Sequence, residues 1–382
     1  MADQAALVLA DGEVFYGESF GHSALFPEEL TLDHSLGTGE VVFNTGMCGY
    51  HEILTDPSYA GQIVVMTYPL IGNYGSDPRW NEGGSEKGVS RKAVKATGFV
   101  VKHLYRGPIP PGRISLDQFL QDQQVPGITG VDTRRLTLHL RDRGTPTGVI
   151  VRIPKGKREL SRSQLKEVVA FLRAFPPMEG RNLIGEVGTA KATSVHREGK
   201  KHMVLIDCGT KAGIVNQLVT LGVRVSILPS SVSLGEVLNL KPHGVLFSNG
   251  PGDPAVLGPQ IELCSRLIGK VPVFGICLGH QLIALALGGR TYKMPFGHHG
   301  VNHPVVDLRD GRVYVTSQNH GFAVDPQGLP SGVRVWMKNA NDGTVEGLYH
   351  EELPVRCVQF HPEAHPGPLD TLWIFKEFMN HT

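Results

Sequence analysis

The sequence has almost no net charge. Its 382 residues contain 37 lysines and arginines against 36 aspartates and glutamates. A chain that attracts nucleic acid or an anionic lipid surface through its overall field needs a clear excess of basic residues. The composition therefore predicts no nucleic acid and no membrane among the partners, and any partner has to be recognised by a local surface.

Cysteine is scarce and follows no pattern. The chain has five cysteines, none of them in a Cys-x-x-Cys pair: Cys48, Cys208, Cys264, Cys277 and Cys357. An odd number at irregular spacing argues against a disulfide framework and against a zinc site, and it is typical of a reducing compartment. We therefore expect no bound metal and a cytoplasmic location.

Long hydrophobic runs and nucleotide-binding signatures are missing as well. The amino terminus lacks the basic start and apolar core of an export signal, and no later stretch is long enough to span a membrane. A soluble, unexported protein is expected. No Gly-x-x-x-x-Gly-Lys-Ser/Thr occurs either, so we expect no cofactor on this chain and no ATP-dependent step that it carries out alone.

One stretch has a clear chemical pattern, Val271-Pro-Val-Phe-Gly-Ile-Cys-Leu-Gly-His-Gln281. One apolar run ends at Gly275 and another starts after Gly279, which predicts a strand, a sharp turn and a helix. Cys277 lies in a Gly-x-Cys-x-Gly frame, the spacing of a nucleophile elbow, where a side chain two residues to either side would collide with the turn. The helix N-terminus would stabilise a negative sulfur, so Cys277 is a candidate nucleophile; the alternative is an inert, buried cysteine.

A thiolate nucleophile needs a base, and the base needs an orienting group. Near the C-terminus an apolar run from Val355 stops at His361, and Glu363 follows two residues later. Residues two apart in a strand share one face. If strand geometry continues through Pro362, Glu363 can hold the His361 ring with its other nitrogen facing Cys277.

From about Lys201 onward, strand-like and helix-like segments alternate. Strands are expected at 203–206, 223–227, 244–247 and 271–274, and helices at 211–221, 233–240, 259–268 and 279–287. This alternation predicts a mainly parallel sheet covered by helices, with reactive groups beyond the carboxyl ends of the strands. A strand, Asp-Gly, strand pattern at 305–315 predicts an antiparallel hairpin beside the parallel core.

The first 152 residues have a different character. Two strand-like runs flank Asp11-Gly12 and predict a hairpin at 6–16, and short apolar runs alternate with glycine-rich turns over 41–75. Helices are expected after the cap residues Ser115 and Asp132. The sequence thus predicts an α/β protein. A β-rich domain is expected at 1–152, a connection with one helix at 153–200 and a helix-covered sheet at 201–382. Within the first domain, residues 80–91 are expected to form a surface loop.

Several motifs together resemble a known family. The elbow, the His361-Pro-Glu363 segment and Phe247-Ser-Asn-Gly-Pro-Gly-Asp-Pro254 resemble the class I (triad) glutamine amidotransferase domain, in which the last is the oxyanion loop. The amino-terminal third resembles the small subunit of carbamoyl phosphate synthetase through Phe43-Asn-Thr-Gly-Met47, Gly49-Tyr-His-Glu-Ile-Leu-Thr-Asp-Pro-Ser-Tyr59, Thr67-Tyr-Pro-Leu-Ile-Gly-Asn73 and Gly130-Val-Asp-Thr-Arg-Arg-Leu136. The resemblance covers nearly the whole chain.

The resemblance assigns roles to residues of this sequence. It implies that Cys277 attacks the side-chain amide of L-glutamine, that His361 transfers protons and that Glu363 orients the ring. Donors for the oxyanion are expected from the backbone N–H of Leu278, which follows the elbow nucleophile, and from that of Gly250 in the glycine loop. The glutamine-binding residues carried over are Ser58, Gly250, Gly252, Leu278, Gln281, Asn319, Gly321 and Phe322. For Ser58, a role as a helix or turn cap remains an alternative.

The same resemblance implies a separate large subunit that uses ATP and magnesium and receives the ammonia. The chain would then be the glutaminase subunit of a glutamine-hydrolysing carbamoyl phosphate synthetase, acting through a γ-glutamyl thioester on Cys277 and serving pyrimidine or arginine synthesis. Three alternatives stay open: a free-standing thiol hydrolase, a glutaminase subunit of a different synthetase, and a catalytically silent interaction subunit. The amino-terminal domain argues against the first, and the presence of Cys277 and His361 argues against the last.

Overall fold

The computed structural model describes residues 3–83, 93–196 and 198–382, which form two compact units. Of these residues, 3–81 and 93–179 form the first unit, and 82–83 and 180–382 form the second. The predicted connection at 153–200 is shared between them, because its helix α4 (Arg162–Ala174) belongs to the first unit. Most of the expected surface loop at 80–91 lies outside the described residues.

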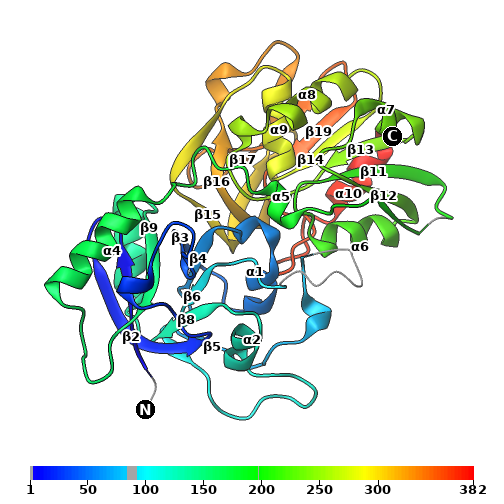
Figure 1. Cartoon of the computed structure of the whole chain (residues 1–382). Helices are drawn as coiled ribbons and strands as arrows, with labels where there is room; N and C mark the ends of the chain where they lie inside the picture. Colours follow the sequence, from blue (N-terminus) through cyan, green and yellow to red (C-terminus); the bar gives the residue numbers. More distant parts are fainter. Residues whose placement is uncertain (1–2, 84–92, 197) are drawn as a thin grey trace. The chain divides into compact units, whose positions relative to one another are not determined.

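A closed barrel forms the centre of the first unit. Among the described strands, the barrel order is β1 (Gln4–Leu9), β2 (Val14–Gly21), β8 (Pro126–Thr129), β6 (Gly98–Val100), β4 (Gln62–Met66), β3 (Thr38–Asn44) and β9 (Thr147–Arg152) (Figure 1). The predicted hairpin is confirmed by the antiparallel pairing of β1 with β2. The β-rich character is also confirmed, whereas the closure of the strands into a barrel was not predicted.

The two faces of strand β1 enter different cores. Leu7 and Leu9 pack inside the barrel with buried side chains from all the other barrel strands, while Val8 faces outward to Val168 and Leu172 of α4. This period of two is what a strand with both faces buried requires. A third core lies under the short elements of this unit: α1 (Tyr50–Thr55), α2 (Leu116–Asp122), β5 (Leu70–Ile71) and β7 (His103–Leu104).

The predicted helix starts in the first unit are confirmed. The Ser115 side chain accepts a hydrogen bond from the backbone of Gln118 at the start of α2. Asp132 does the same for Arg135 at the start of α3 (Thr133–Arg143). Each cap satisfies one of the backbone N–H groups that a helix N-terminus leaves without a partner.

A mixed sheet organises the second unit. Ten of the described strands follow the order β10 (Thr193–Val195), β12 (Val223–Pro229), β11 (Lys201–Asp207), β13 (Gly244–Phe247), β14 (Val273–Ile276), β19 (Val355–Val358), β18 (Val345–His350), β17 (Val333–Asn339), β15 (Thr291–Asp307) and β16 (Val313–Val324). Neighbours from β12 to β19 are parallel, which confirms the predicted parallel core. The sheet then continues with antiparallel strands, and the hairpin predicted at 305–315 is the tip of the much longer β15–β16 pair.

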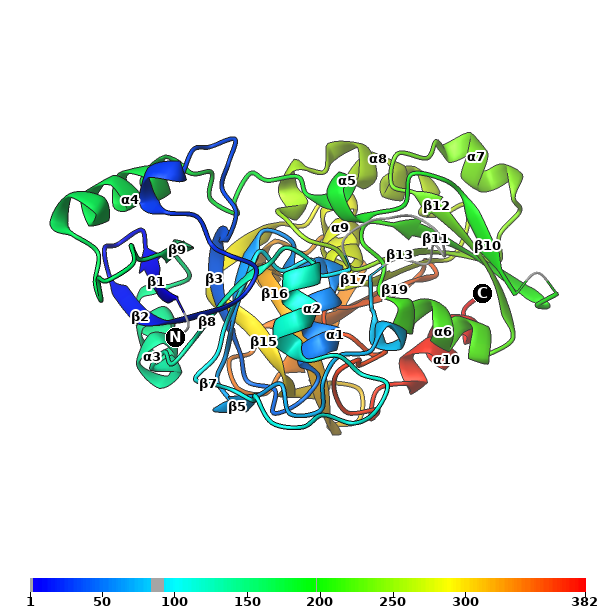
Figure 2. The same ribbon diagram turned by 60° about the horizontal axis from the view of Figure 1, so that its bottom comes forward.

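Helices cover both faces of the parallel core (Figure 2). Met203 and Leu205 of β11 share one core with α6 (Ala212–Thr220) and α10 (Trp373–Asn380). Val204 and Ile206 face the other core, which contains α7 (Leu234–Asn239), α8 (Gly258–Leu267) and α9 (Leu278–Ala286), with the short α5 (Ile184–Val187) beside it. Burial on both sides explains why the middle of β11, residues 203–206, is apolar at four consecutive positions rather than at alternate ones.

The described part of the chain contains no helix that is both long and apolar enough to cross a membrane.

One aromatic pair ties α10 to the centre of the sheet. The ring of Phe378 stacks on that of Phe274 in β14, with ring centroids 4.9 Å apart, and both side chains are fully buried. Phe378→Ala should therefore lower the free energy of unfolding of the second unit by about 3–5 kcal/mol. Guanidinium unfolding followed by tryptophan fluorescence measures this, since Trp336 and Trp373 lie in this unit.

The control for this experiment is Leu369→Ala. The Leu369 side chain is 59% exposed, so its loss should change the free energy of unfolding by no more than about 0.5 kcal/mol. Equal effects of the two substitutions would contradict the packing role of Phe378.

Candidate active site

The predicted elbow is present between β14 and α9. β14 ends at Ile276, α9 begins at Leu278, and Cys277 between them has φ 54° and ψ −104°. A positive φ is unfavourable for a residue with a side chain and persists only where the surroundings enforce it. Here the Cys277 backbone N–H donates to the carbonyl of Val358 in the neighbouring strand region, at 2.9 Å. The cysteine is thereby held at the tip of the turn.

Both glycines of the elbow are required by close packing. A Cβ atom on Gly275 would lie 2.5 Å from the carbonyl carbon of Gly279. One on Gly279 would lie 2.0 Å from the carbonyl oxygen of Phe247, at the end of β13. The collision expected from the sequence pattern is therefore confirmed, and it involves the next strand as well as the turn itself.

His361 and Glu363 are in contact, as predicted, but not within a continuous strand. Nδ1 of His361 lies 2.7 Å from Oε1 of Glu363. β19 already ends at Val358, and His361 makes an isolated bridge with Ser317. The chain then turns, because the Ala364 N–H donates to the His361 carbonyl. The expected extension of the strand through this segment is thus wrong, and a turn brings the two side chains together instead.

A buried lysine that the sequence analysis missed lies behind this pair. Lys211 Nζ is 3.2 Å from Glu363 Oε1, and both side chains are shielded from solvent. Lys211 also donates to the carbonyl of Ala364, and its own backbone N–H donates to the side chain of Asn249. No local pattern marks Lys211; its position just beyond the carboxyl end of β11, where the other candidate residues gather, was the only available signal.

The second ring nitrogen of His361, Nε2, is not used in a structural hydrogen bond with the described residues. Nε2 is buried and makes no hydrogen bond of ordinary geometry with the described residues. Cys277 is near enough to act on the ring electrostatically, while its Sγ atom contacts the carbonyl oxygen of Asn319 at 3.6 Å. The sulfur and the imidazole are thus neighbours, with the ring already oriented by Glu363.

The glycine loop after β13 packs against the elbow. The Gly279 N–H donates to the carbonyl of Ser248 at 3.0 Å. A Cβ on Gly250 would lie 2.9 Å from a methyl group of Leu278 and 2.2 Å from the carbonyl oxygen of Cys208. The two residues expected to supply oxyanion donors, Gly250 and Leu278, are therefore adjacent.

Gly252 completes the same loop. Its φ is +93°, and a Cβ there would lie 2.6 Å from the carbonyl oxygen of Arg181. It forms an isolated bridge with Asn182. Only glycine tolerates this combination of backbone angle and contact.

Four of the eight expected glutamine-binding residues lie in β16 or bond to it. Asn319, Gly321 and Phe322 lie in this strand. Gln281, on the first turn of α9, donates through Nε2 to the Phe322 carbonyl at 2.8 Å and to Gln359 at 3.0 Å. The helix that follows the nucleophile is thereby fixed to the strand that contains Asn319.

Ser58 belongs to the first unit, in the 3-10 turn Pro57–Tyr59. The cap of this turn is Asp56, whose carboxylate accepts a hydrogen bond from the Ser58 N–H at 2.9 Å. Ser58 is therefore not the capping residue, so that alternative is wrong. Its expected contact with glutamine stays a prediction.

Comparisons with known proteins agree with this geometry. Residues 204–381 match the family model "Glutamine amidotransferase class-I", and residues 7–150 match "Carbamoyl-phosphate synthase small chain, CPSase domain". The carbamoyl phosphate synthase small chain of Methanopyrus kandleri is 46% identical over 378 residues, which cover 98% of each chain. That of Akkermansia muciniphila is 45% identical over 388 residues, covering 98% of this chain and 96% of the relative. The chain belongs to the carbamoyl phosphate synthase small-chain family.

The two family matches lie largely in different units, although the match over 7–150 includes Glu82 of the second unit. The amidotransferase match contains Cys277, His361, Glu363 and Lys211, all in the second unit, and the match to the small-chain domain contains Ser58.

Burial and charge set the protonation of the His361–Glu363 pair. Burial alone would raise the pKa of Glu363, but the Lys211 ammonium and then the His361 ring outweigh it and lower the pKa. Burial alone would lower the pKa of His361, but the Glu363 carboxylate and then the neighbouring Cys277 outweigh it and raise the pKa. The arrangement therefore favours a carboxylate beside an imidazolium at neutral pH.

The other buried cysteines lack such surroundings. Burial raises the pKa of the thiols of Cys208, Cys264 and Cys357. A thiol that keeps its proton is a poor nucleophile, so these three residues are expected to be unreactive.

The effect of Glu363 on His361 can be measured directly. Glu363→Gln removes the charge that opposes burial, so the pKa of His361 should fall by about 1 to 3, and the ring should lose its proton at a lower pH. NMR titration of ring-labelled histidine reports this, with the His361 signal assigned by its absence in His361→Asn. Glu351→Gln, a substitution at an exposed position, is the matched control; an unchanged His361 titration in Glu363→Gln would refute the assignment.

Proposed function

We propose that this chain is the glutaminase component of a glutamine-hydrolysing carbamoyl phosphate synthase. One observation carries the proposal: a cysteine with a strained backbone at a helix N-terminus lies beside the buried array of His361, Glu363 and Lys211. The chain in which this occurs belongs to the small-chain family. The substrate is L-glutamine. Cysteine, histidine and carboxylate in this relation are suited to acyl transfer.

The first half of the reaction produces ammonia. The Cys277 sulfur attacks the side-chain carbonyl carbon of glutamine, and the carbonyl oxygen becomes a tetrahedral oxyanion. The backbone N–H groups of Leu278 and Gly250 donate to that oxyanion. The C–N bond then breaks, the His361 imidazolium gives its proton to the departing nitrogen, and a γ-glutamyl thioester remains on Cys277.

The second half regenerates the enzyme. His361, now neutral, takes a proton from a water molecule that attacks the thioester carbon. Glutamate leaves, and the proton held by His361 balances the charge of the returned thiolate. Throughout the cycle Glu363 holds one ring tautomer, and Lys211 keeps Glu363 ionised although both side chains are buried.

Substrate binding is assigned to the loop and strand beside the elbow. We infer that six residues recognise the amino-acid end of glutamine: Gln281, Asn319, Gly321, Phe322, Gly252 and Ser58. Two contacts with Cys277 support this assignment: the Gln281 N–H donates to the Cys277 carbonyl, and the Asn319 carbonyl oxygen lies 3.6 Å from Sγ.

The ammonia is proposed to pass to a separate large subunit that binds ATP and magnesium and makes carbamoyl phosphate from bicarbonate. The small-chain names of the relatives support such a partner, and the sequence of this chain carries no Gly-x-x-x-x-Gly-Lys-Ser/Thr signature of its own. The complex is proposed to work in the cytoplasm.

Cys277→Ser should separate the two activities of the complex. Glutamine-dependent synthesis should be lost, while synthesis from added ammonium should stay close to the unsubstituted rate, because only ammonia production is damaged. Both rates are measured as carbamoyl phosphate formed by the assembled enzyme. Cys48→Ser, at an exposed position of the first unit, is the control and should change neither rate.

An equal fall of both rates in Cys277→Ser would instead make Cys277 a structural residue. If Cys277→Ser abolishes glutamine hydrolysis but the parent chain is never found assembled with a synthetase, the free-standing hydrolase would be favoured.

His361 and Glu363 should differ in their contribution to turnover. His361→Asn removes the proton carrier, whereas Glu363→Gln removes only its orientation and charge partner. We expect Glu363→Gln to retain more turnover than His361→Asn, by a margin of up to about 100-fold, with little change in KM for glutamine. Steady-state glutaminase assays test this; an equal loss together with weakened glutamine binding would place Glu363 in the substrate pocket.

A further inference from the structure

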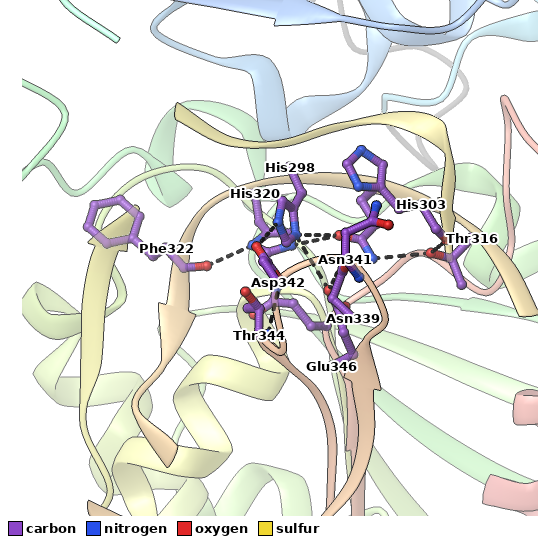
Figure 3. Close-up of polar contacts among 12 residues, drawn as sticks. His298, His303, Thr316, His320, Phe322, Asn339, Asn341, Asp342, Thr344 and Glu346 are labelled. Carbon is purple, nitrogen blue, oxygen red and sulfur yellow. Dashed lines mark hydrogen bonds and ion pairs between the residues drawn. The ribbon is translucent and has the colours of Figure 1, made fainter. Parts of the chain in front are cut away.

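A second buried polar cluster lies apart from the His361–Glu363 pair, where β15, β16 and β18 meet (Figure 3). Its core consists of His298, His320 and Glu346, whose potential ligand atoms all lie within 4.8 Å of one another. All three residues are at most 5% exposed. Each comes from a different strand, so no short sequence motif marks the cluster.

The outer nitrogen of each ring is already occupied by an acceptor. Nε2 of His298 lies 2.9 Å from a carboxylate oxygen of Asp342, and Nδ1 of His320 lies 2.8 Å from the Phe322 carbonyl oxygen. Both acceptors require a hydrogen on the ring nitrogen. A neutral imidazole has only one such hydrogen, so in the neutral form of each ring the inner nitrogen, Nδ1 of His298 or Nε2 of His320, presents a lone pair.

The amide of Gln318 adds a third lone-pair atom at the centre. The Thr316 hydroxyl donates to the His303 carbonyl at 2.8 Å, so its oxygen accepts from Gln318 Nε2 at 3.1 Å. This fixes the orientation of the amide. Its Oε1 consequently faces the inner nitrogens of His298 and His320, at 2.9 and 3.0 Å.

The Glu346 carboxylate supplies the fourth side of the same space. Its Oε1 atom is 3.5 Å from Nδ1 of His298 and accepts from Asn339 at 3.2 Å. Its Oε2 atom is buried and makes no hydrogen bond with the described residues. Four acceptor groups therefore converge with no hydrogen between them, an arrangement that needs a positive charge at its centre.

Two protons or one divalent cation would supply that charge. A proton on each ring would place two cations with centroids only 5.0 Å apart in the protein interior, which like-charge repulsion disfavours. A single proton on Nδ1 of His298, facing Gln318 and Glu346, would still leave Nε2 of His320 and Oε1 of Gln318 3.0 Å apart with no hydrogen between them. We propose that His298 Nδ1, His320 Nε2 and Glu346 bind a divalent transition-metal ion, with Gln318 Oε1 as the neighbouring fourth oxygen. A set of two imidazoles and a carboxylate without thiolate suits zinc, cobalt or nickel.

The surroundings have the form that such a site requires. Four nitrogen and oxygen ligands about 2.0–2.1 Å from zinc stand about 3.4 Å apart in a tetrahedron, close to the separations found here. Asp342 and the Phe322 carbonyl hold the two rings in the tautomers that present their inner nitrogens to the ion, which is the usual role of groups behind metal-ligating histidines. The Asp342 side chain is 45% exposed, so the cluster lies one layer below the surface.

The proposed ion would stabilise β16, the strand that contains three of the proposed glutamine-binding residues. His320 lies between Asn319 and Gly321 in β16, and the Phe322 carbonyl that holds His320 also accepts from Gln281. With its ligands all from protein the site is structural, and this departs from the expectation of no bound metal.

Zinc binding by the full-length chain tests the proposal without any use of glutamine, so its failure and that of the proposed function are separable. Zn²⁺ is titrated against a competing chelator and counted by mass spectrometry in the Cys277→Ser chain, in which the elbow thiol cannot contribute. We expect one tightly held Zn²⁺ per chain and a rise in melting temperature with free zinc. Co²⁺ in its place should give the visible absorption of a four-coordinate site.

Three substitutions give a graded response. Glu346→Gln removes a ligand and should weaken zinc binding more than about 100-fold, and Asp342→Asn, which leaves all ligands in place, should weaken it about 10- to 100-fold. Glu351→Gln, an exposed carboxylate just after β18, should bind like the parent chain. Circular dichroism confirms that each variant is folded.

The proposal is overturned if the parent chain holds no Zn²⁺, Co²⁺ or Ni²⁺ beyond the level of Glu346→Gln. It is equally overturned if Glu346→Gln and Asp342→Asn bind zinc as tightly as Glu351→Gln does. In either case, protons on the clustered side chains, and not a metal ion, would supply the positive charge.

Discussion

The close approach of three backbone segments at the elbow is the constraint on which the rest of the second unit depends. Gly275, Gly279 and the end of β13 leave no room for a single additional carbon atom. This packing forces Cys277 into a backbone conformation that it would not otherwise adopt. It also sets the distance between the elbow and the glycine loop, so the proposed nucleophile and the proposed N–H donors are placed by the same contact.

The electrostatics of the site follow from burial. A lone ionised carboxylate, ammonium or imidazolium in this interior would be strongly destabilised. Lys211, Glu363 and His361 avoid that cost because each charge faces an opposite one at hydrogen-bonding distance. Glu363 is the anion that both cations share, so its replacement would leave the charges of Lys211 and His361 buried without their partner.

Sequence patterns predicted the structural features that are determined by residues close together in the chain. The elbow, the contact between His361 and Glu363, the two capped helices and the alternation of strands and helices are all set by spacings of a few residues, and the structure contains each of them. Their exact bounds shifted by a few positions, and the strand expected through Pro362 is a turn, because pairing with a neighbouring strand decides where an extended segment ends.

Contacts between distant parts of the chain could not be predicted in this way. Lys211 meets Glu363 across more than a hundred residues, the barrel closes through the pairing of β1 with β9, and the cluster around His298 draws on three strands. None of these leaves a periodic or spaced pattern. Single lysines and histidines in a sequence are too common to indicate which of them becomes buried and paired.

The second unit is not made from one continuous piece of the chain. Glu82, which the sequence places far upstream, belongs to this unit and accepts hydrogen bonds from the backbone N–H groups of Ala212 and Gly213. These are the first residues of α6, directly after Lys211. A single cut after residue 179 would therefore leave this helix cap on the wrong fragment. A fragment that began at residue 180 would have to satisfy these first N–H groups of α6, next to Lys211, by other means.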